Sequence, residues 1–468
     1  MKPFNNFYRL IKSGLLIITL SGNASIQASD NQAEHLQPLP TSTMLGVRPV
    51  SSDAAEKVTV QAVAAGSSAA EIGILVQDKL IELDGKAIKD FDHLIQTLAN
   101  KRVGDQVSFV VDRNGKLVTL TGKMKARTRE KSDIALVDYA TVYWNNQRIR
   151  TITYTPQAIL TNNQKAPAIF YLQGYTCGSI DYGFIPKITT LQLIKQFVEA
   201  GFIVYRAEKL GVGDSRGNLH CNDVDFTTEV AAFTASLRKL KSHKNVNANQ
   251  IYLWGHSLGV LAAPAIAKQE KVAGIIGYGG VHKSWHDYML DIYSKQATLY
   301  FGTDEKTAQN NLKMIKPFIH DWLKSDRSWA DLLKHKEAIN SGLLPISGTQ
   351  IFSRHYSFFR DLNQYDFKKL WQELQIPTLM IHGSLDIQAI SKNWAFDIAN
   401  SVNKGGSNLG KALVIENAEH ALMSYKNIQE NLDARANGQY NPGRPEGWYE
   451  AKIGETTIEW IKNLNSTK

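Results

Sequence analysis

The sequence contains little cysteine, no long hydrophobic run and no dense group of metal-ligating side chains. Only two cysteines, Cys177 and Cys221, occur among its 468 residues. No apolar run reaches the roughly 20 residues that a membrane-spanning helix needs, so we expect no transmembrane segment in the mature chain. No pair of His or Cys residues has metal-ligand spacing and no acidic cluster is dense, so the sequence predicts neither a metal site nor a cofactor.

The chain carries a mild excess of positive charge. The formal net charge is +9, but no basic stripe alternates with aromatic side chains, which disfavours a nucleic-acid partner. The glycine-rich segment 211–217 lacks the Lys-Ser/Thr ending of a phosphate-binding loop, so it does not favour a nucleotide site either. Other motifs must therefore carry the function.

Residues 1–28 have the pattern of a secretory signal peptide. Three basic residues precede a short apolar stretch at 14–20, and Ala28 offers a small residue for cleavage. The pattern predicts an exported protein, periplasmic or secreted. Residues 29–41, which include two prolines and show no periodicity, are expected to form a linker.

A serine between two glycines follows a short apolar run. Residues 251–254 predict a buried strand, and Gly255-His256-Ser257-Leu258-Gly259 comes directly after it, at the start of a helix-like stretch. A tight strand-to-helix turn crowds the backbone on both sides of the serine, so it requires small residues such as Gly255 and Gly259. The arrangement predicts that Ser257 is a nucleophile exposed above a sheet. An ordinary strand-to-helix turn is the alternative.

A hydroxyl nucleophile needs a base and an orienting carboxylate, and both occur downstream. Residues 376–382 and 412–416 predict two more buried strands. Asp386 follows the first of these strands and His420 follows the second. The pattern therefore predicts Ser257 as nucleophile, His420 as base and Asp386 as orienting acid.

The order Ser, Asp, His resembles that of the α/β-hydrolase superfamily, and the likeness extends from about residue 139 to the C-terminus. The resemblance implies an α/β fold with a mostly parallel sheet, helices on both faces and an antiparallel hairpin at its start. The hydrolase domain would cover residues 139–468. An aromatic-rich insertion at about 281–371 lies where this superfamily carries a helical cap over the active site.

The same resemblance implies two backbone N–H donors for an oxyanion. Leu258 supplies one by its position after the nucleophile, and Tyr175, in a segment that resembles the family's HG-x loop, supplies the other. Cys177 lies in this loop, and Cys221 follows the next strand at the same edge of the sheet. Their proximity favours a disulfide in an oxidising compartment. Two buried free thiols are the alternative.

Residues 42–124 resemble a PDZ domain of the bacterial type, a small β-rich fold. An x-Leu-Gly-Val loop opens the segment, and strand-like and helical stretches follow in that family's order. The resemblance implies that the N–H groups of Leu45, Gly46 and Val47 capture the terminal carboxylate of a peptide. Pro49 removes one N–H from the strand that such a peptide would pair with. A packing or regulatory domain without a peptide ligand is the alternative.

The charged segment 125–138 is expected to be a linker that few contacts cross, so a chain that starts near Asp133 would fold alone. The whole pattern favours a serine hydrolase that cleaves a carboxylic ester with a small acyl group. A serine peptidase that receives peptides from the PDZ-like domain is one alternative. A non-catalytic peptide-binding protein is the other.

Overall fold

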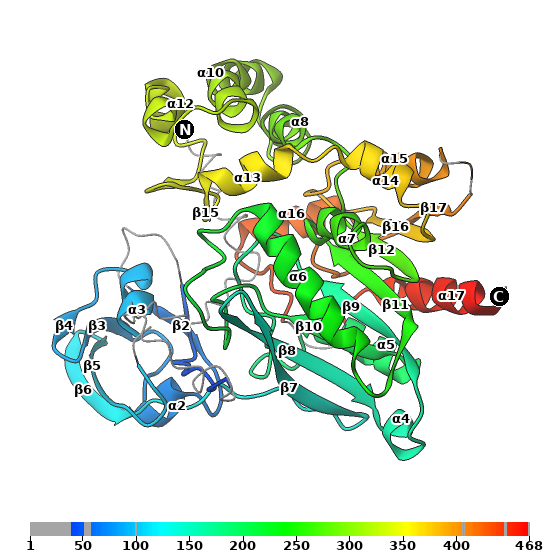
Figure 1. Ribbon diagram of the computed structural model, residues 1–468. Helices are drawn as coiled ribbons and strands as arrows, with labels where there is room; N and C mark the ends of the chain where they lie inside the picture. The colour runs from blue at the N-terminus through cyan, green and yellow to red at the C-terminus, as the bar shows by residue number, and fades with distance from the viewer. Residues whose placement is uncertain are drawn as a thin grey trace.

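The computed structural model describes residues 39–50, 58–98, 101–404, 406, 408–443 and 447–466 (Figure 1). The expected signal peptide and most of the expected linker after it lie outside the described residues. Within these ranges the chain forms a small β-rich domain, a large sheet covered by helices, and a mostly helical insertion at the top of Figure 1. No helix in the same ranges has the length and apolarity needed to cross a membrane.

The small domain, blue and cyan in Figure 1, folds around one hydrophobic core. Its helix α2 begins after Ser67, whose side chain accepts a hydrogen bond from Ala70 N, and ends at Gly73 in the left-handed conformation. Buried and more exposed side chains alternate along most of β5, as in a strand with one solvated face. The elements are β1 (Val47–Pro49), β2 (Val60–Val63), α2 (Ser68–Ile72), β3 (Lys79–Leu83), β4 (Lys86–Ala87), α3 (Phe91–Leu98), β5 (Gln106–Arg113) and β6 (Lys116–Lys123).

The central sheet has eight strands in the order β17-β16-β12-β11-β9-β10-β8-β7. The strands from β17 to β10 run parallel to their neighbours, while β8 is antiparallel to both β10 and β7. The predicted mostly parallel sheet with an initial antiparallel hairpin is therefore confirmed. The strands are β7 (Ala135–Trp144), β8 (Gln147–Pro156), β9 (Ala166–Leu172), β10 (Ile203–Ala207), β11 (Val246–His256), β12 (Gly274–Tyr278), β16 (Thr378–Gly383) and β17 (Gly410–Ile415).

Helices cover both faces of this sheet and divide its core into two hydrophobic clusters. Helix α7 is apolar and buried along its whole length because it packs between the sheet and helices α6 and α14. On the opposite face, α5 and α17 pack against each other. The helices are α4 (Gln157–Thr161), α5 (Thr189–Glu199), α6 (Phe226–Lys241), α7 (Gly259–Ala267), α14 (Phe367–Glu373), α15 (Asn393–Asn403), α16 (Ile428–Ala436) and α17 (Lys452–Ser466).

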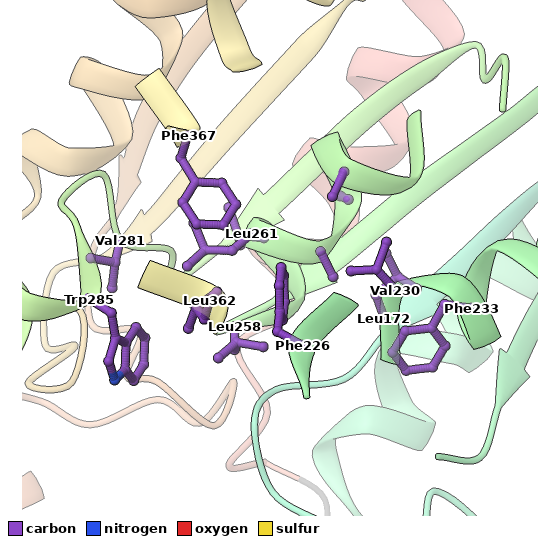
Figure 2. Packing of buried hydrophobic residues seen from close by; sticks show 14 of the residues in the cluster. Leu172, Phe226, Val230, Phe233, Leu258, Leu261, Val281, Trp285, Leu362 and Phe367 are labelled. Atoms are coloured by element: carbon purple, nitrogen blue, oxygen red, sulfur yellow. The ribbon is translucent and has the colours of Figure 1, made fainter. Parts of the chain in front are cut away.

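Between β12 and β16 the chain forms the insertion that the resemblance implied as a cap. It is mostly helical, but it also contains a small antiparallel sheet that the sequence did not predict. Cap and sheet share one hydrophobic cluster, to which the cap contributes Trp285 and Leu362, and the nucleophile turn contributes Leu258 (Figure 2). The elements are α8 (Trp285–Asp291), η2 (Ile292–Gln296), α9 (Ala297–Tyr300), α10 (Glu305–Lys324), α11 (Trp329–Leu332), α12 (Lys336–Asn340), β13 (Ile346–Ser347), β14 (Gln350–Ile351), β15 (Arg354–His355) and α13 (Tyr356–Asn363).

The segment 125–138 differs from the isolated linker that its charged composition suggested. Its last four residues already belong to β7. Arg127 and Glu130 are buried, and Glu130 pairs with Arg206 of β10, each of those two side chains being no more than 1% exposed. Composition misleads here because the partner that buries Glu130 lies far away in the sequence.

Further contacts join Ser42 of the small domain and Arg127 of the connecting segment to loops of the hydrolase domain. Ser42 N donates to Asp214 Oδ1 at 2.7 Å, and Ser42 Oγ donates to Gly213 O at 2.8 Å. Arg127 donates to Ser179 Oγ at 2.6 Å. A chain that starts at Asp133 would leave these buried partners unsatisfied, which is costly. We therefore propose that residues 125–134 fold as part of the hydrolase domain.

Candidate active site

Ser257 occupies a strained turn between β11 and α7. Its φ is +55°, in the left-handed region that residues other than glycine seldom adopt. A Cβ atom on Gly255 would lie 2.5 Å from Gly259 O, and one on Gly259 would lie 2.2 Å from Leu172 O. Both positions therefore exclude a side chain, for the steric reason that the sequence motif suggested.

Asp386 and His420 meet in the interior of the protein. Asp386 Oδ2 accepts a hydrogen bond from His420 Nδ1 at 2.8 Å, and Asp386 Oδ1 accepts from the N–H groups of Gln388 and Ala389. Burial alone would raise the pKa of Asp386, but the charge and hydrogen bond of His420 hold this pKa well below its usual value. An ionised Asp386 keeps the proton on Nδ1 of His420, which leaves Nε2 to act as the base.

Ser257 and His420 line the same cavity. Within the described ranges, Ser257 Oγ makes no hydrogen bond to His420, and contacts of this kind commonly tighten only when substrate binds. The structure thus brings the three predicted residues to the carboxyl ends of β11, β16 and β17.

His256, the residue before the nucleophile, forms a hydrogen bond to the backbone of the base. Its Nε2 donates to the backbone oxygen of His420 at 2.7 Å, and its Nδ1 lies 3.1 Å from the hydroxyl of Tyr171. Because a carbonyl only accepts, Nε2 carries the proton and Nδ1 accepts from Tyr171. Burial, together with the charge of His420, lowers the pKa of His256 to about 4, so this imidazole is neutral near pH 7.

We expect the stability of the His256→Gln variant to fall less than that of the wild type as the pH is lowered. The pKa of His256 is about 4 in the folded chain and about 6.5 when the chain is unfolded. Its contribution to stability is therefore fully present above about pH 6.5 and is lost as the pH falls towards about 4. Glutamine can still donate to His420 O but does not titrate. Thermal unfolding between pH 6.5 and 4 should show a smaller loss for the variant, and equal losses would contradict the neutral role.

The loop after β9 lies against the nucleophile. A Cβ atom on Gly174 would stand 3.2 Å from Ser257 Cβ. Tyr175 and Leu258, the two predicted oxyanion donors, line the same cavity as Ser257. The predicted disulfide between Cys177 and Cys221 is present and ties this loop to the segment that follows β10.

The cavity above Ser257 is about 230 Å³ in volume and mostly apolar. Among the residues that the structure describes, the lining includes no aspartate, glutamate or lysine, and its one arginine, Arg435, is buried and donates to Glu419 at 2.7 Å. Across the described ranges, no group of three or more His, Cys, Asp or Glu side chains is arranged to hold a metal ion. The cap supplies much of the apolar lining, from Trp285, Tyr288, Met289, Phe301, Phe352 and Phe359.

The residue before the base, Glu419, also shapes the site, although the sequence analysis did not single it out. Glu419 is fully buried, and its Oε1 accepts from the N–H groups of Ala421 (2.6 Å) and Met423 (3.1 Å). Its Oε2 accepts from Arg435 and from Tyr440. This carboxylate fixes the turn that presents His420. A charged loop residue is usually solvated, so its pattern alone does not distinguish it from a surface glutamate.

The predicted carboxylate loop of the small domain is tightly packed. Leu45 is only 4% exposed, while Gly46 and Val47 are partly exposed. Gly46 has a φ of +82°, and a Cβ atom there would lie 2.2 Å from Ser67 Cβ. The strand after the loop, β1, pairs with β2 and shows an irregular register at Pro49.

Comparison with known proteins assigns both parts of the chain. Residues 189–425, just over half of the chain, match the family model described as serine aminopeptidase, S33. The chain belongs to the S33 family of α/β-hydrolases. Residues 43–124 match the PDZ domain model, which confirms that resemblance. The protein is therefore a serine hydrolase with an N-terminal PDZ domain.

Individual relatives of this S33 hydrolase are distant. Esterase EstD of Thermotoga maritima is 22% identical over 325 residues, which cover 67% of this chain and 68% of that protein. Among solved structures, Est1E from Butyrivibrio proteoclasticus is 13% identical with a TM-score of 0.42, covering 70% of this chain and 99% of that one. A monoglyceride lipase variant from Saccharomyces cerevisiae is 14% identical with a TM-score of 0.41, covering 72% and 97%. At such scores the two structural likenesses carry no argument about activity.

Proposed function

We propose that this serine hydrolase cleaves carboxylic esters with small, uncharged, apolar acyl groups. Ser257 attacks the ester carbonyl while His420 Nε2 takes its proton, and Asp386 stabilises the resulting imidazolium. The N–H groups of Leu258 and Tyr175 bind the oxyanion. His420 returns the proton to the leaving alcohol, and water then hydrolyses the acyl-enzyme by the same steps.

The chemistry of the cavity carries this proposal. An aminopeptidase has to hold the charged α-amine of its substrate, and a carboxylate is the usual partner for a buried ammonium group. The described part of the chain places no carboxylate in the cavity lining, and Glu419 is already occupied by Arg435 and Tyr440. The aromatic lining suits an apolar acyl group, whose burial contributes about 0.8 kcal/mol per CH₂ group. The esterase relative in Thermotoga maritima agrees with this choice.

A substrate panel tests the proposal. The purified mature protein is assayed against p-nitrophenyl esters of increasing acyl length and against aminoacyl and peptidyl p-nitroanilides. We expect ester turnover to rise with acyl length and to fall once the acyl chain outgrows the cavity, with little turnover of the amides. Preferential turnover of aminoacyl amides would instead establish the peptidase alternative.

We propose further that the PDZ domain binds peptides with free, apolar C-termini at Leu45, Gly46 and Val47. The match of residues 43–124 to the PDZ model supports this role. Catalytically inactive full-length protein, Ser257→Ala, should bind such a peptide more tightly than its C-terminal amide in fluorescence anisotropy.

The domain also offers a matched pair of glycine variants for this test. Gly46→Ala should weaken binding of the free acid because the new Cβ would overlap Ser67. Gly66→Ala serves as control, since Gly66 also has a positive φ (+70°) but has no heavy atom within 4 Å of the new Cβ. Equal binding of acid and amide would exclude carboxylate capture.

Export of the protein is the third part of the proposal. The signal-like residues 1–28 motivate it, and the Cys177–Cys221 disulfide supports it because such bonds persist in oxidising compartments. Mass spectrometry of the mature protein should find an N-terminus near residue 29. An intact Met1 in the active protein would contradict export by cleavage.

A further inference from the structure

Three charged side chains lie buried beside the loop at 173–177. Glu229 of α6 stands between Lys209 and Arg354, with 3.0 Å to Lys209 Nζ and 2.8 Å to Arg354 Nη2. Both cationic side chains are 0% exposed, and Glu229 is 4% exposed. Burial opposes ionisation of Glu229, but Arg354 and Lys209 hold its pKa below the usual value. Such a buried triad is costly to desolvate, so stability alone does not account for it.

The two cations also hold consecutive carbonyl groups of the loop. Lys209 Nζ donates to Gly174 O at 2.6 Å, and Arg354 Nη1 donates to Tyr175 O at 2.7 Å. A trans peptide unit is planar, with its C=O and N–H pointing in opposite directions. Fixing Gly174 O therefore fixes the N–H of Tyr175. Fixing Tyr175 O fixes the N–H of Thr176.

We propose that Lys209 and Arg354, linked through Glu229, are positioning residues for the oxyanion site. Lys209 aims the N–H of Tyr175 at Ser257, and Arg354 fixes the adjoining peptide unit between Tyr175 and Thr176, which restrains rotation of Tyr175. The inference rests on the proposed esterase function. Gly174 lies directly against Ser257, so the peptide unit that Lys209 holds borders the reacting atoms. A donor aimed in advance need not reorganise when negative charge develops, and such donors contribute strongly to acyl transfer. The positive charges of Lys209 and Arg354 at the carbonyl oxygens also polarise the two peptide units, which strengthens their N–H groups as donors.

Arg354 belongs to the cap, so the cap would complete the oxyanion site as well as cover the cavity. It lies on β15, next to residues that bind the segment just after Cys221. His355 N donates to Asn222 O at 2.5 Å, and Asn222 Nδ2 donates to Ser353 O at 2.7 Å. The disulfide joins this segment to the oxyanion loop at Cys177. The position of the cap and the direction of the Tyr175 N–H are thereby coupled through one contiguous set of contacts.

The test compares Lys209→Met and Arg354→Met with a matched cap control, Arg360→Met. Arg360 also donates to backbone oxygens, those of Trp322 and Arg327, but only within the cap. Full-length protein is used, with folding checked by circular dichroism and active sites titrated with a fluorophosphonate. We expect kcat for a p-nitrophenyl ester to fall about 10- to 100-fold in both test variants, less than for outright deletion of an oxyanion donor. KM should change less than about twofold, and the control should keep its kcat.

A transition-state mimic separates positioning from simple loosening of the fold. An alkyl trifluoromethyl ketone adds to the serine and forms an oxyanion, whereas the matching methyl ketone only fills the cavity. The trifluoromethyl ketone should lose affinity in parallel with kcat, the methyl ketone should not, and Arg354→Lys should recover part of both losses. If Lys209→Met does not fold, the Arg354 pair still decides the question.

Equal loss of affinity for both ketones, or an unchanged kcat, would overturn the positioning role. Failure of the proposed esterase function looks different, because wild-type protein would then hydrolyse no ester at all.

Discussion

Ser257→Ala is expected to remove nearly all ester turnover, by a factor of at least about 10⁴, and to abolish labelling by a fluorophosphonate. The serine is the proposed nucleophile, and members of a triad act as a unit, so loss of one removes most of the rate. The elbow should tolerate alanine, because Ser257 makes its backbone contact through its N–H, which donates to Tyr278 O at 2.9 Å. The decisive assay is turnover of the best p-nitrophenyl ester under saturating conditions.

His420→Ala should lose activity to a similar extent, whereas removal of a serine outside the cavity should not. Ser284 offers that control, since it caps α8 and does not line the cavity. Fluorophosphonate labelling that persists in a folded Ser257→Ala protein would mean that another residue is the nucleophile.

Of the substitutions described, Glu130→Ala is expected to lower the free energy of unfolding the most. The carboxylate accepts from Tyr154 Oη at 2.6 Å and Tyr182 N at 2.6 Å, and it pairs with Arg206, which is 0% exposed. Alanine would leave the Arg206 guanidinium buried without its carboxylate, which typically costs about 3–5 kcal/mol. The Tm of the hydrolase domain should fall by on the order of 10 °C. Differential scanning calorimetry of the full chain measures this shift.

An exposed ion pair on the same connection provides the control. Glu71 pairs with Lys125, and these side chains are 59% and 37% exposed. Exposed pairs contribute only about 0–1 kcal/mol, so Glu71→Ala should barely change the Tm. Similar Tm values for the Glu130 and Glu71 variants would restore the view of 125–138 as a simple linker.

Local sequence patterns were sufficient to predict the strands of the sheet and the edge of the sheet at which the three candidate residues meet. Each of the three predicted residues follows an apolar strand, and parallel strands end at the same edge of a sheet. Their positions after these strands were therefore enough to predict that Ser257, Asp386 and His420 lie close together. The glycines at 255 and 259 are informative for the same reason, since their role depends on contacts within a few residues or with the adjacent strand.

Buried charges were the part that the sequence could not place. Glu130, Glu229 and Glu419 are each buried by partners that include residues distant in sequence or in other elements, such as Arg206, Arg354 and Arg435. An interpretation of the sequence pattern assigns isolated charged residues to the surface because most charged residues lie there. The small sheet in the cap escaped prediction for a related reason, since strands of two residues leave no periodic signal.

The most direct test of the proposed function is to trap and locate the acyl-enzyme. The protein is mixed with a p-nitrophenyl ester, quenched in acid within the first turnover and digested with trypsin for mass spectrometry. We predict that the acyl group is found on the peptide spanning residues 245–268, which contains Ser257 and no other serine. Ester turnover with no acyl group on this peptide, or with the acyl group elsewhere, would contradict the account.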